Sequence, residues 1–393
     1  MKKILLLILG AACLVAITAC SGREAYVPES TPDYTAPVQT QTPAETPESS
    51  AEPADIVEIH SAKMWNEFAE SYNDEREKYA DYVTIQITGE LDFENIDFIP
   101  LADGFSGKIT AVEPVLGEEE RKLWINERKK WPLDYKGNFM NISRIKDIDG
   151  KKAASLFGSV GELELENVSF ACVYLSDIKC MFVENADSLK LYNVRVQNCA
   201  LPVGRSIAAI NVGDISVEQF VAESCVLTGY EYMGGITCFV SGDAKFKDVF
   251  LCRCSLTLSP DNGGSGLWSS GIGLLAKSVN GAASFENIDI YGCNSTGLYT
   301  DALVNSVGAI SICRDVSLDV CTFMNYRPMG SGYSSGLISS CGETKLMDLP
   351  AFEEKISITN SNIGGEYTEA DFEKRGYLVE NCIFVSSKEE PPQ

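Results

Sequence analysis

The sequence predicts an all-β solenoid, a fold built from repeats of short strands. One polar residue recurs eight times in the second half, with an apolar residue or thiol two positions before it and an apolar residue three positions after it. The recurrence is imperfect, at intervals of roughly 21 to 45 residues. Such repeats, built on short β-type runs, indicate a solenoid. The eight positions are Asn167, Asn193, Gln219, Asp248, Asn287, Asp315, Asn360 and Asn381.

A structural role for this polar column follows from its residue types. Asparagine and aspartate tolerate the left-handed backbone conformation that a sharp bend needs. Their side chains can also form a hydrogen bond with the equivalent residue of the next repeat. We therefore interpret the column as a structural ladder and not as a row of catalytic side chains.

A second column consists of thiols. Cys199, Cys225, Cys254, Cys293 and Cys321 each follow a column residue by six positions, and Cys172 follows Asn167 by five. Equivalent positions of stacked strands lie about 4.8 Å apart. Disulfide pairing is compatible with that distance, but parallel Cβ vectors suit the disulfide dihedral poorly. The pattern favours free thiols buried as small hydrophobes, and a reducing habitat. No metal site is predicted, since only Cys252 and Cys254 approach a ligand spacing.

The N-terminus indicates export. Met1-Lys2-Lys3 precedes an apolar run over 4–17 that is too short for a transmembrane helix. The run ends Ile17-Thr18-Ala19-Cys20-Ser21, which resembles the signal of a bacterial lipoprotein. This resemblance implies a signal peptide over 1–19 and a lipidated Cys20. It also implies an extracytoplasmic protein whose lipid anchors it to the cell membrane.

Residues 20–54 predict a disordered tether. From Arg23 to Ala54 the chain is dominated by Pro, Thr, Ser, Glu, Ala and Gln. Such a segment buries too little apolar surface to offset the entropy of ordering. A proline-rich chain extends by about 3.1 Å per residue, so the tether suits a stalk that holds a folded domain away from the membrane.

The composition narrows the function. The chain has 56 acidic and 32 basic residues and a formal net charge of −24, which disfavours nucleic acid as a partner. His60 is the single histidine, so Ser-His-Asp and Cys-His catalysis and multi-histidine zinc sites are not expected. No cofactor is predicted. Asp147-Ile148-Asp149-Gly150 and Asp261-Asn262-Gly263-Gly264 look like fragments of calcium loops, but both lack the full ligand set.

The first part of the folded chain, over 55–150, predicts a cap and the first strands. Ser61 to Tyr79 is expected to form a helix that Ser61 caps, with Met64, Phe68 and Tyr72 recurring at helical spacing. The helix covers the open end of the solenoid in this interpretation. A strand is expected at 82–88, and a charged surface helix at 118–130. The repeats occupy 151–393 and end in a short polar tail.

Several short motifs resemble bacterial surface proteins with the GLUG motif. They include Leu91-Asp92-Phe93, Ile99-Pro100-Leu101, Phe105-Ser106-Gly107 and Ala154-Ser155-Leu156-Phe157-Gly158. Later segments, Gly234-Gly235-Ile236 and Ser335-Gly336-Leu337-Ile338, echo the Gly-Gly-Leu core of that motif. The resemblance implies a right-handed parallel β-helix and an adhesin-like or glycan-associated role. It supplies no catalytic residues. The chain departs from the motif where Leu101-Ala102 replaces Ile-Gly.

Aromatic residues in the loops after the thiol column are the candidate ligand-binding residues. Because equivalent loops of a solenoid stack on one side, we expect the rings to line one long face. Aromatic rings with polar tips offer stacking surface for sugar rings, so the face is predicted to bind an extended polymer, and a glycan in particular. Alternatively, the rings stack on one another and rigidify the loops. They are Tyr174, Tyr230, Tyr232, Trp268, Tyr299, Tyr326 and Tyr333.

Two other functions remain open. The first is a polysaccharide lyase or glycoside hydrolase of the pectate-lyase-like type, for which acidic residues are plentiful. No pair of them has a spacing that singles out an acid and a base. The second is a passive structural or interaction protein. The favoured prediction is a binding or adhesion module on the cell surface, which contacts a polysaccharide or a host or cell-surface partner.

Overall fold

The computed structural model divides the chain into two units, Met1–Ala51 and Glu52–Gln393. It describes residues 55–112, 141–146, 148, 154–229, 232–258, 271–297, 300–325, 336–341, 344–345, 356–365, 368–374 and 376–386, all in the second unit. The expected signal peptide, Cys20, the tether, the helix at 118–130 and most residues of both calcium-loop fragments lie outside the described residues.

The described part of the second unit consists mainly of parallel β-structure, which confirms the all-β prediction. Twenty-one strands form a large sheet and seven form a small sheet. All pairings between these strands are parallel except that of β23 with β24. The small sheet contains β10 (Ala200–Leu201), β13 (Val226–Gly229), β17 (Ser255–Leu258), β20 (Asn294–Gly297), β22 (Thr322–Asn325), β26 (Asn362–Gly365) and β28 (Ile383–Ser386).

The large sheet includes strands from almost the whole described chain. Its members are β1 (Asp55–Ile59), β2 (Val83–Ile87), β3 (Leu91–Asp92), β4 (Phe105–Ala111), β5 (Ile142–Ser143), β6 (Val160–Glu166), β7 (Ser169–Ala171), β8 (Val183–Tyr192), β9 (Arg195–Gln197), β11 (Ala209–Glu218), β12 (Val221–Glu223), β14 (Met233–Gly234), β15 (Thr237–Val240), β16 (Ala244–Cys252), β18 (Ile272–Gly273), β19 (Ala276–Tyr291), β21 (Thr300–Asp319), β23 (Gly336–Cys341), β24 (Thr344–Lys345), β25 (Ile356–Thr359) and β27 (Tyr377–Glu380).

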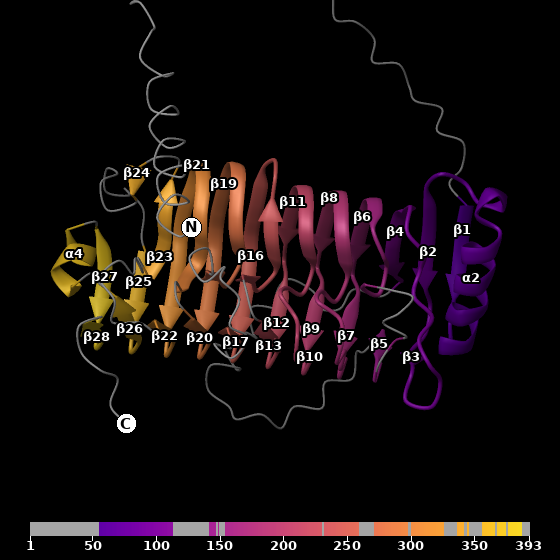
Figure 1. Cartoon of the computed structure of the whole chain (residues 1–393), viewed down its shortest axis with the longest axis horizontal. Helices are drawn as coiled ribbons and strands as arrows, with labels where there is room; N and C mark the ends of the chain where they lie inside the picture. The colour runs from indigo at the N-terminus through magenta and orange to yellow at the C-terminus, as the bar shows by residue number, and fades with distance from the viewer. Residues whose placement is uncertain are drawn as a thin grey trace, which may run out of the picture. The chain divides into compact units, whose positions relative to one another are not determined.

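Apart from β24, the strands pair in parallel with equivalent strands of neighbouring repeats, which lie side by side in Figure 1. Equivalent side chains therefore stack on one another. One inward row runs through Leu165, Leu191, Val217, Phe246, Phe285 and Cys313. All six of these side chains are buried, and the rings of Phe246 and Phe285 lie parallel with their centroids 5.7 Å apart. The apolar residues at every second position thus form one continuous core.

The helix α2 (Ala62–Asp74) buries the apolar side that its sequence spacing predicts. Ser61 Oγ accepts a hydrogen bond from the Met64 amide, which caps the helix. Trp65 is fully buried, stacks on Phe98, and donates from Nε1 to the carbonyl oxygen of Ile99 at 3.0 Å. The α-helix is shorter than predicted, since a separate 3₁₀ turn, η1 (Arg76–Lys78), follows it.

A second, shorter helix, α4 (Glu369–Glu373), precedes the last strand of the large sheet. Its Phe372 is fully buried against the rings of Tyr377 and Phe384. Thr368 and Asp371 form a reciprocal capping box at its start. Figure 1 shows α2 beside the first strands of the unit and α4 beside the last.

All eight residues of the predicted polar column adopt the left-handed conformation, with φ between 49° and 56°. Asn193 donates to Asn167 at 2.8 Å, and Asn287 donates to Asp248 at 2.5 Å. These are side-chain bonds between neighbouring repeats. The bend conformation and part of the ladder are therefore present in the structure.

The eight residues do not form a single column, and this corrects the predicted alignment. A second set of left-handed residues follows the first by five positions and includes Cys172, Asn198, Ser224, Arg253, Gly292 and Val320. Asp319 pairs with Thr359, and Thr359 pairs with Glu380. Asn360 and Asn381 therefore stack on Val320, in the second column. At both bends an apolar residue or thiol usually lies two positions before and an apolar residue three positions after, and Ser295, three positions after Gly292, is an exception. The local frame therefore does not distinguish the two bends.

The thiols form the predicted internal column. The register places Cys199, Cys225, Cys254, Cys293 and Cys321 on consecutive repeats, followed by Ser361 and Cys382. Each of the five contiguous thiols donates to the backbone carbonyl two residues before it. The eleven cysteines whose side chains the structure describes form no disulfide. Cys172 is exposed and belongs to the second left-handed column instead.

Candidate functional site

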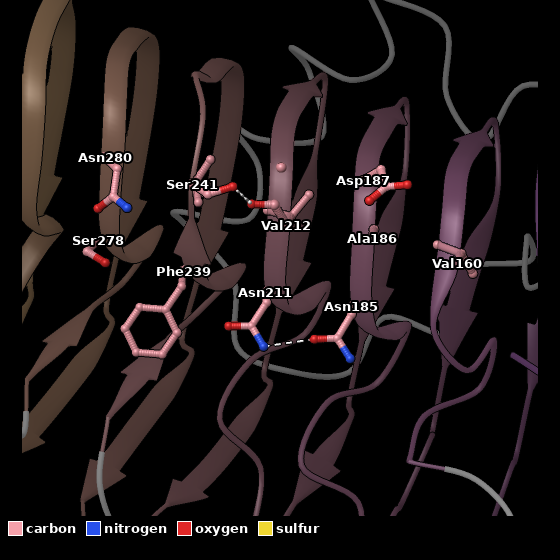
Figure 2. A pocket seen from close by; sticks show the side chains of 12 residues that line it. Val160, Asn185, Ala186, Asp187, Asn211, Val212, Phe239, Ser241, Ser278 and Asn280 are labelled. Carbon is pink, nitrogen blue, oxygen red and sulfur yellow. Dashed lines mark hydrogen bonds between the residues drawn. The ribbon is translucent and has the colours of Figure 1, made fainter. Parts of the chain in front are cut away.

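A groove with a volume of about 460 Å³ crosses the outer side of the large sheet. It spans β6, β8, β11, β15 and β19, so its length follows the direction in which the repeats stack (Figure 2). The lining residues are Val160, Asn185, Ala186, Asp187, Asn211, Val212, Gly213, Phe239, Val240, Ser241, Ser278 and Asn280. Amides, a carboxylate, hydroxyls and one aromatic ring therefore share a single depression.

The strand register explains why these residues meet. Asn185 pairs with Asn211, Asn211 with Phe239, and Phe239 with Ser278. The next position along each strand, held by Ala186, Val212, Val240 and Val279, is buried. The groove thus combines a row of accessible side chains with an apolar row beside it.

Hydrogen bonds orient the amides of the groove. Asn211 Nδ2 donates to Asn185 Oδ1 at 2.9 Å (Figure 2). Asn185 Nδ2 donates to Ser159 Oγ at 3.1 Å. Each amide nitrogen carries two hydrogens, so each keeps one donor for a ligand, and Asn211 keeps its Oδ1 acceptor. Ser241 Oγ donates to the Val212 carbonyl oxygen at 3.3 Å. This polar row is held in place and retains hydrogen-bonding capacity.

Phe239 packs against the ring of Tyr232, which in turn contacts the Arg205 guanidinium. The ring of Tyr232 meets that of Phe239 edge-on, with centroids 4.5 Å apart. The Arg205 guanidinium lies 4.4 Å from the centre of the Tyr232 ring and also bonds its hydroxyl. Tyr232 and Phe239 together cover a buried cluster of Cys180, Ile210 and Cys238. The Phe239 ring is therefore fixed at the groove.

The thiols of this cluster are strongly perturbed. Burial raises the pKa of Cys180 and of Cys238 to about 12. Ser206 Oγ lies 3.3 Å from Cys180 Sγ, and Cys238 Sγ donates to the Arg205 carbonyl oxygen at 3.3 Å. Protonated thiols of this kind are poor nucleophiles, so they serve packing.

A partly buried lysine lies beside the groove. Lys277 precedes the groove residue Ser278, and its Nζ donates to Asn305 Oδ1 at 2.6 Å. Asn305 in turn donates to Asp301, which is fully buried. Burial lowers the pKa of Lys277, and the nearby Asp301 carboxylate partly counters that effect. This cation is therefore engaged within the protein.

The seven predicted aromatic residues do not share one face where the structure describes them. Tyr174 is 49% exposed and pairs with Ala200 of the small sheet. Tyr232 instead packs on Phe239 of the large sheet. Phe239 is not one of the seven, so this contact does not test whether the seven rings stack on one another. Tyr230, Trp268, Tyr299, Tyr326 and Tyr333 lie outside the described residues.

Several carboxylates serve bends and strand ends. Asp243 accepts from the Ala282 amide at 2.7 Å, Asp248 accepts from Asn287, and Asp319 accepts from Asn360 at 2.8 Å. Within the described ranges, no three His, Cys, Asp or Glu side chains are arranged to hold a metal ion. No helix among the described residues is both long and apolar enough to cross a membrane.

Comparisons with protein families, with curated proteins and with solved structures returned no match.

The groove residues are not among the candidate ligand-binding residues that the sequence predicts. A faint signal exists, since Asn185-Ala-Asp187 and Asn211-Val-Gly213 recur in the same frame 26 residues apart. Both asparagines precede a buried residue, as many surface residues of strands do. Only the pairing of β8 with β11, and of β11 with β15, shows that they lie beside an aromatic ring.

Proposed function

We propose that the protein is a surface lipoprotein whose repeats form a right-handed parallel β-helix of the GLUG-like kind. Parallel pairing one repeat apart supports this fold, as do two columns of left-handed residues five positions apart. The N-terminal signal pattern around Cys20 supports lipid anchoring outside the cytoplasm. The tether at 20–54 then separates the folded unit from the membrane.

We further propose that this unit binds an extended glycan. The groove over β8, β11, β15 and β19 carries this proposal, because it places amides, hydroxyls and the Phe239 ring side by side. Aromatic rings stack on the apolar side of sugar rings, while amide groups pair with sugar hydroxyls. A groove that continues over several repeats suits a polymer better than a compact small molecule.

The test is a glycan array probed with the full chain, purified in mild detergent. Selective binding to a glycan supports the proposal, and the double variant N185A/N211A is expected to weaken it by about ten-fold or more. N294A serves as a matched control, since Asn294 is an exposed asparagine on the small sheet, away from the groove. Equal loss in N294A, or a blank array, contradicts glycan binding at this site. Shortening of the bound polymer during incubation indicates an enzyme instead.

A further inference from the structure

The groove has one sign of charge. Among its twelve lining residues, Asp187 is the acidic one, and neither lysine nor arginine is present. Asp187 is exposed, and its carboxylate makes no hydrogen bond with the described residues. The chain as a whole carries a formal net charge of −24. A ligand that bears carboxylates meets repulsion in this groove and finds no cation to pair with.

The two cations beside the groove do not alter this balance. Lys277 is bound by Asn305, near the buried Asp301. Arg205 lies over the Tyr232 ring and bonds its hydroxyl. Lys277 thus contacts a residue of β21, and Arg205 contacts Tyr232, which directly precedes β14. Moving either one toward a ligand would cost its present contacts.

The polar groups also define a direction. Asn185, Asn211, Phe239 and Ser278 hold the same register position on four neighbouring strands. Neighbouring strands are about 4.8 Å apart, so the row offers one contact about every 4.8 Å across the strands. Asn280, on β19, extends the polar lining at the far end of the row. A polymer that follows the row contacts every repeat, whereas one lying along a single strand contacts one or two.

We infer that the ligand of this groove is an uncharged glycan whose chain lies across β8, β11, β15 and β19. Its hydroxyls pair with Asn185, Asn211 and Asn280, and one sugar ring packs on Phe239. Asp187 accepts hydrogen bonds from hydroxyl groups and disfavours uronic acids and other anionic sugars. This inference rests on the proposed glycan binding and specifies its ligand class.

The charge test uses the full chain on an array that carries neutral oligosaccharides together with carboxylated and sulfated ones. Neutral glycans are expected to bind, and anionic analogues of the same linkage to bind at least ten-fold more weakly at low salt. D187N is expected to reduce the difference in affinity between neutral and anionic glycans. A higher salt concentration is expected to reduce the same difference in the parent chain. Binding confined to anionic glycans overturns the inference while glycan binding stands. A blank array overturns both.

The direction test compares short and long oligomers of the best neutral ligand by calorimetry. Affinity is expected to rise with length and level off once the oligomer spans roughly 15–20 Å, which is the width of four strands. Asn185 and Asn280 lie on β8 and β19, the two outer strands of the four. N185A and N280A are therefore each expected to weaken binding of the long oligomer by about ten-fold. Each variant is expected to change the affinity for a disaccharide by less than about two-fold. N294A is expected to leave the affinity for both ligands unchanged. A long oligomer that is insensitive to one of the two ends overturns the crossing orientation.

Discussion

Asn360 stacks directly on Val320. The Val320 amide donates to the carbonyl oxygen of Thr359 at 3.2 Å, and both residues are left-handed, with φ of 56° for Val320 and 49° for Asn360. Asparagine suits this conformation, whereas a β-branched residue does not. Val320 is therefore strained at this bend, whereas Asn360, at the equivalent bend of the next repeat, adopts the same conformation without strain.

The V320N variant is expected to be more stable than the parent chain by about 1 kcal/mol. Val320 is 47% exposed, so little packing is lost. Denaturant unfolding measures the change. V226N is the matched control, because Val226 is equally exposed at 47% but lies within strand β13. A V320N variant that is no more stable than the parent would show that the bend at Val320 is not a source of strain.

The thiol column is expected to accept serine. Ser361 already occupies an equivalent position and donates to the Thr359 carbonyl oxygen at 2.7 Å, as Cys254 donates to that of Cys252. C254S therefore keeps an acceptor for its hydroxyl, and we expect it to cost less than about 1 kcal/mol. C254V has no donor and a different shape, and is expected to cost more. The reverse order in chemical denaturation would contradict this account of the column.

Ser295 lies in the core without a hydrogen-bond partner for its hydroxyl in the described part of the chain. It pairs with Leu256 and Phe323 on the neighbouring strands. S295A removes a buried polar group at little cost in volume, so stability should be unchanged or rise by up to about 1 kcal/mol. Thermal unfolding tests this.

S361A provides the contrast to S295A. Ser361 is buried too, but its hydroxyl accepts from the Cys321 amide at 3.1 Å and donates to the Thr359 carbonyl oxygen. Its removal leaves the Cys321 amide without this acceptor, whereas the Thr359 carbonyl oxygen keeps the Val320 amide as a donor. We expect a loss of stability of about 1–3 kcal/mol. If both variants lose stability to the same extent, the contrast between a bonded and an unbonded hydroxyl is not what decides it.

Alkaline pH is expected to destabilise the fold through its buried thiols. The pKa of Cys180 and Cys238 is raised from 9.0 to about 12 by burial. A thiol in the unfolded chain loses its proton above about pH 9, whereas the folded protein retains it up to about pH 12. Stability is therefore fully present below pH 9 and falls as the pH rises toward 12.

Urea midpoints measured between pH 7 and pH 10.5 test this dependence. C238A is expected to make the fall less steep, because it removes one of the buried thiols whose pKa is raised. Cys225, Cys254, Cys293 and Cys321 also have a raised pKa. C172A removes an exposed thiol and is expected to leave the slope as in the parent chain. Equal slopes in all three proteins would assign the alkaline loss to other groups.

Much of the fold follows from local rules that operate along the chain. Alternating apolar residues predict strands with one buried side, and Asn167, Asn193 and Asn287 predict bends because their side chains tolerate positive φ. Ser61 and the spacing of the apolar residues after it predict α2. Each of these rules needs only a few neighbouring residues.

Register and side-chain neighbourhood depend on contacts between distant residues. Asn360 fits the frame of either bend, and its pairing with the preceding repeat places it on Val320. The sequence predicts Tyr174 and Tyr232 on one face, but the two lie over different sheets. The groove arises because parallel pairing brings Asn185 and Asn211 beside Phe239. The repeat can be predicted from a local sequence pattern. The register between repeats, and the side chains that come together at the groove, depend on strand pairing between residues far apart in the sequence.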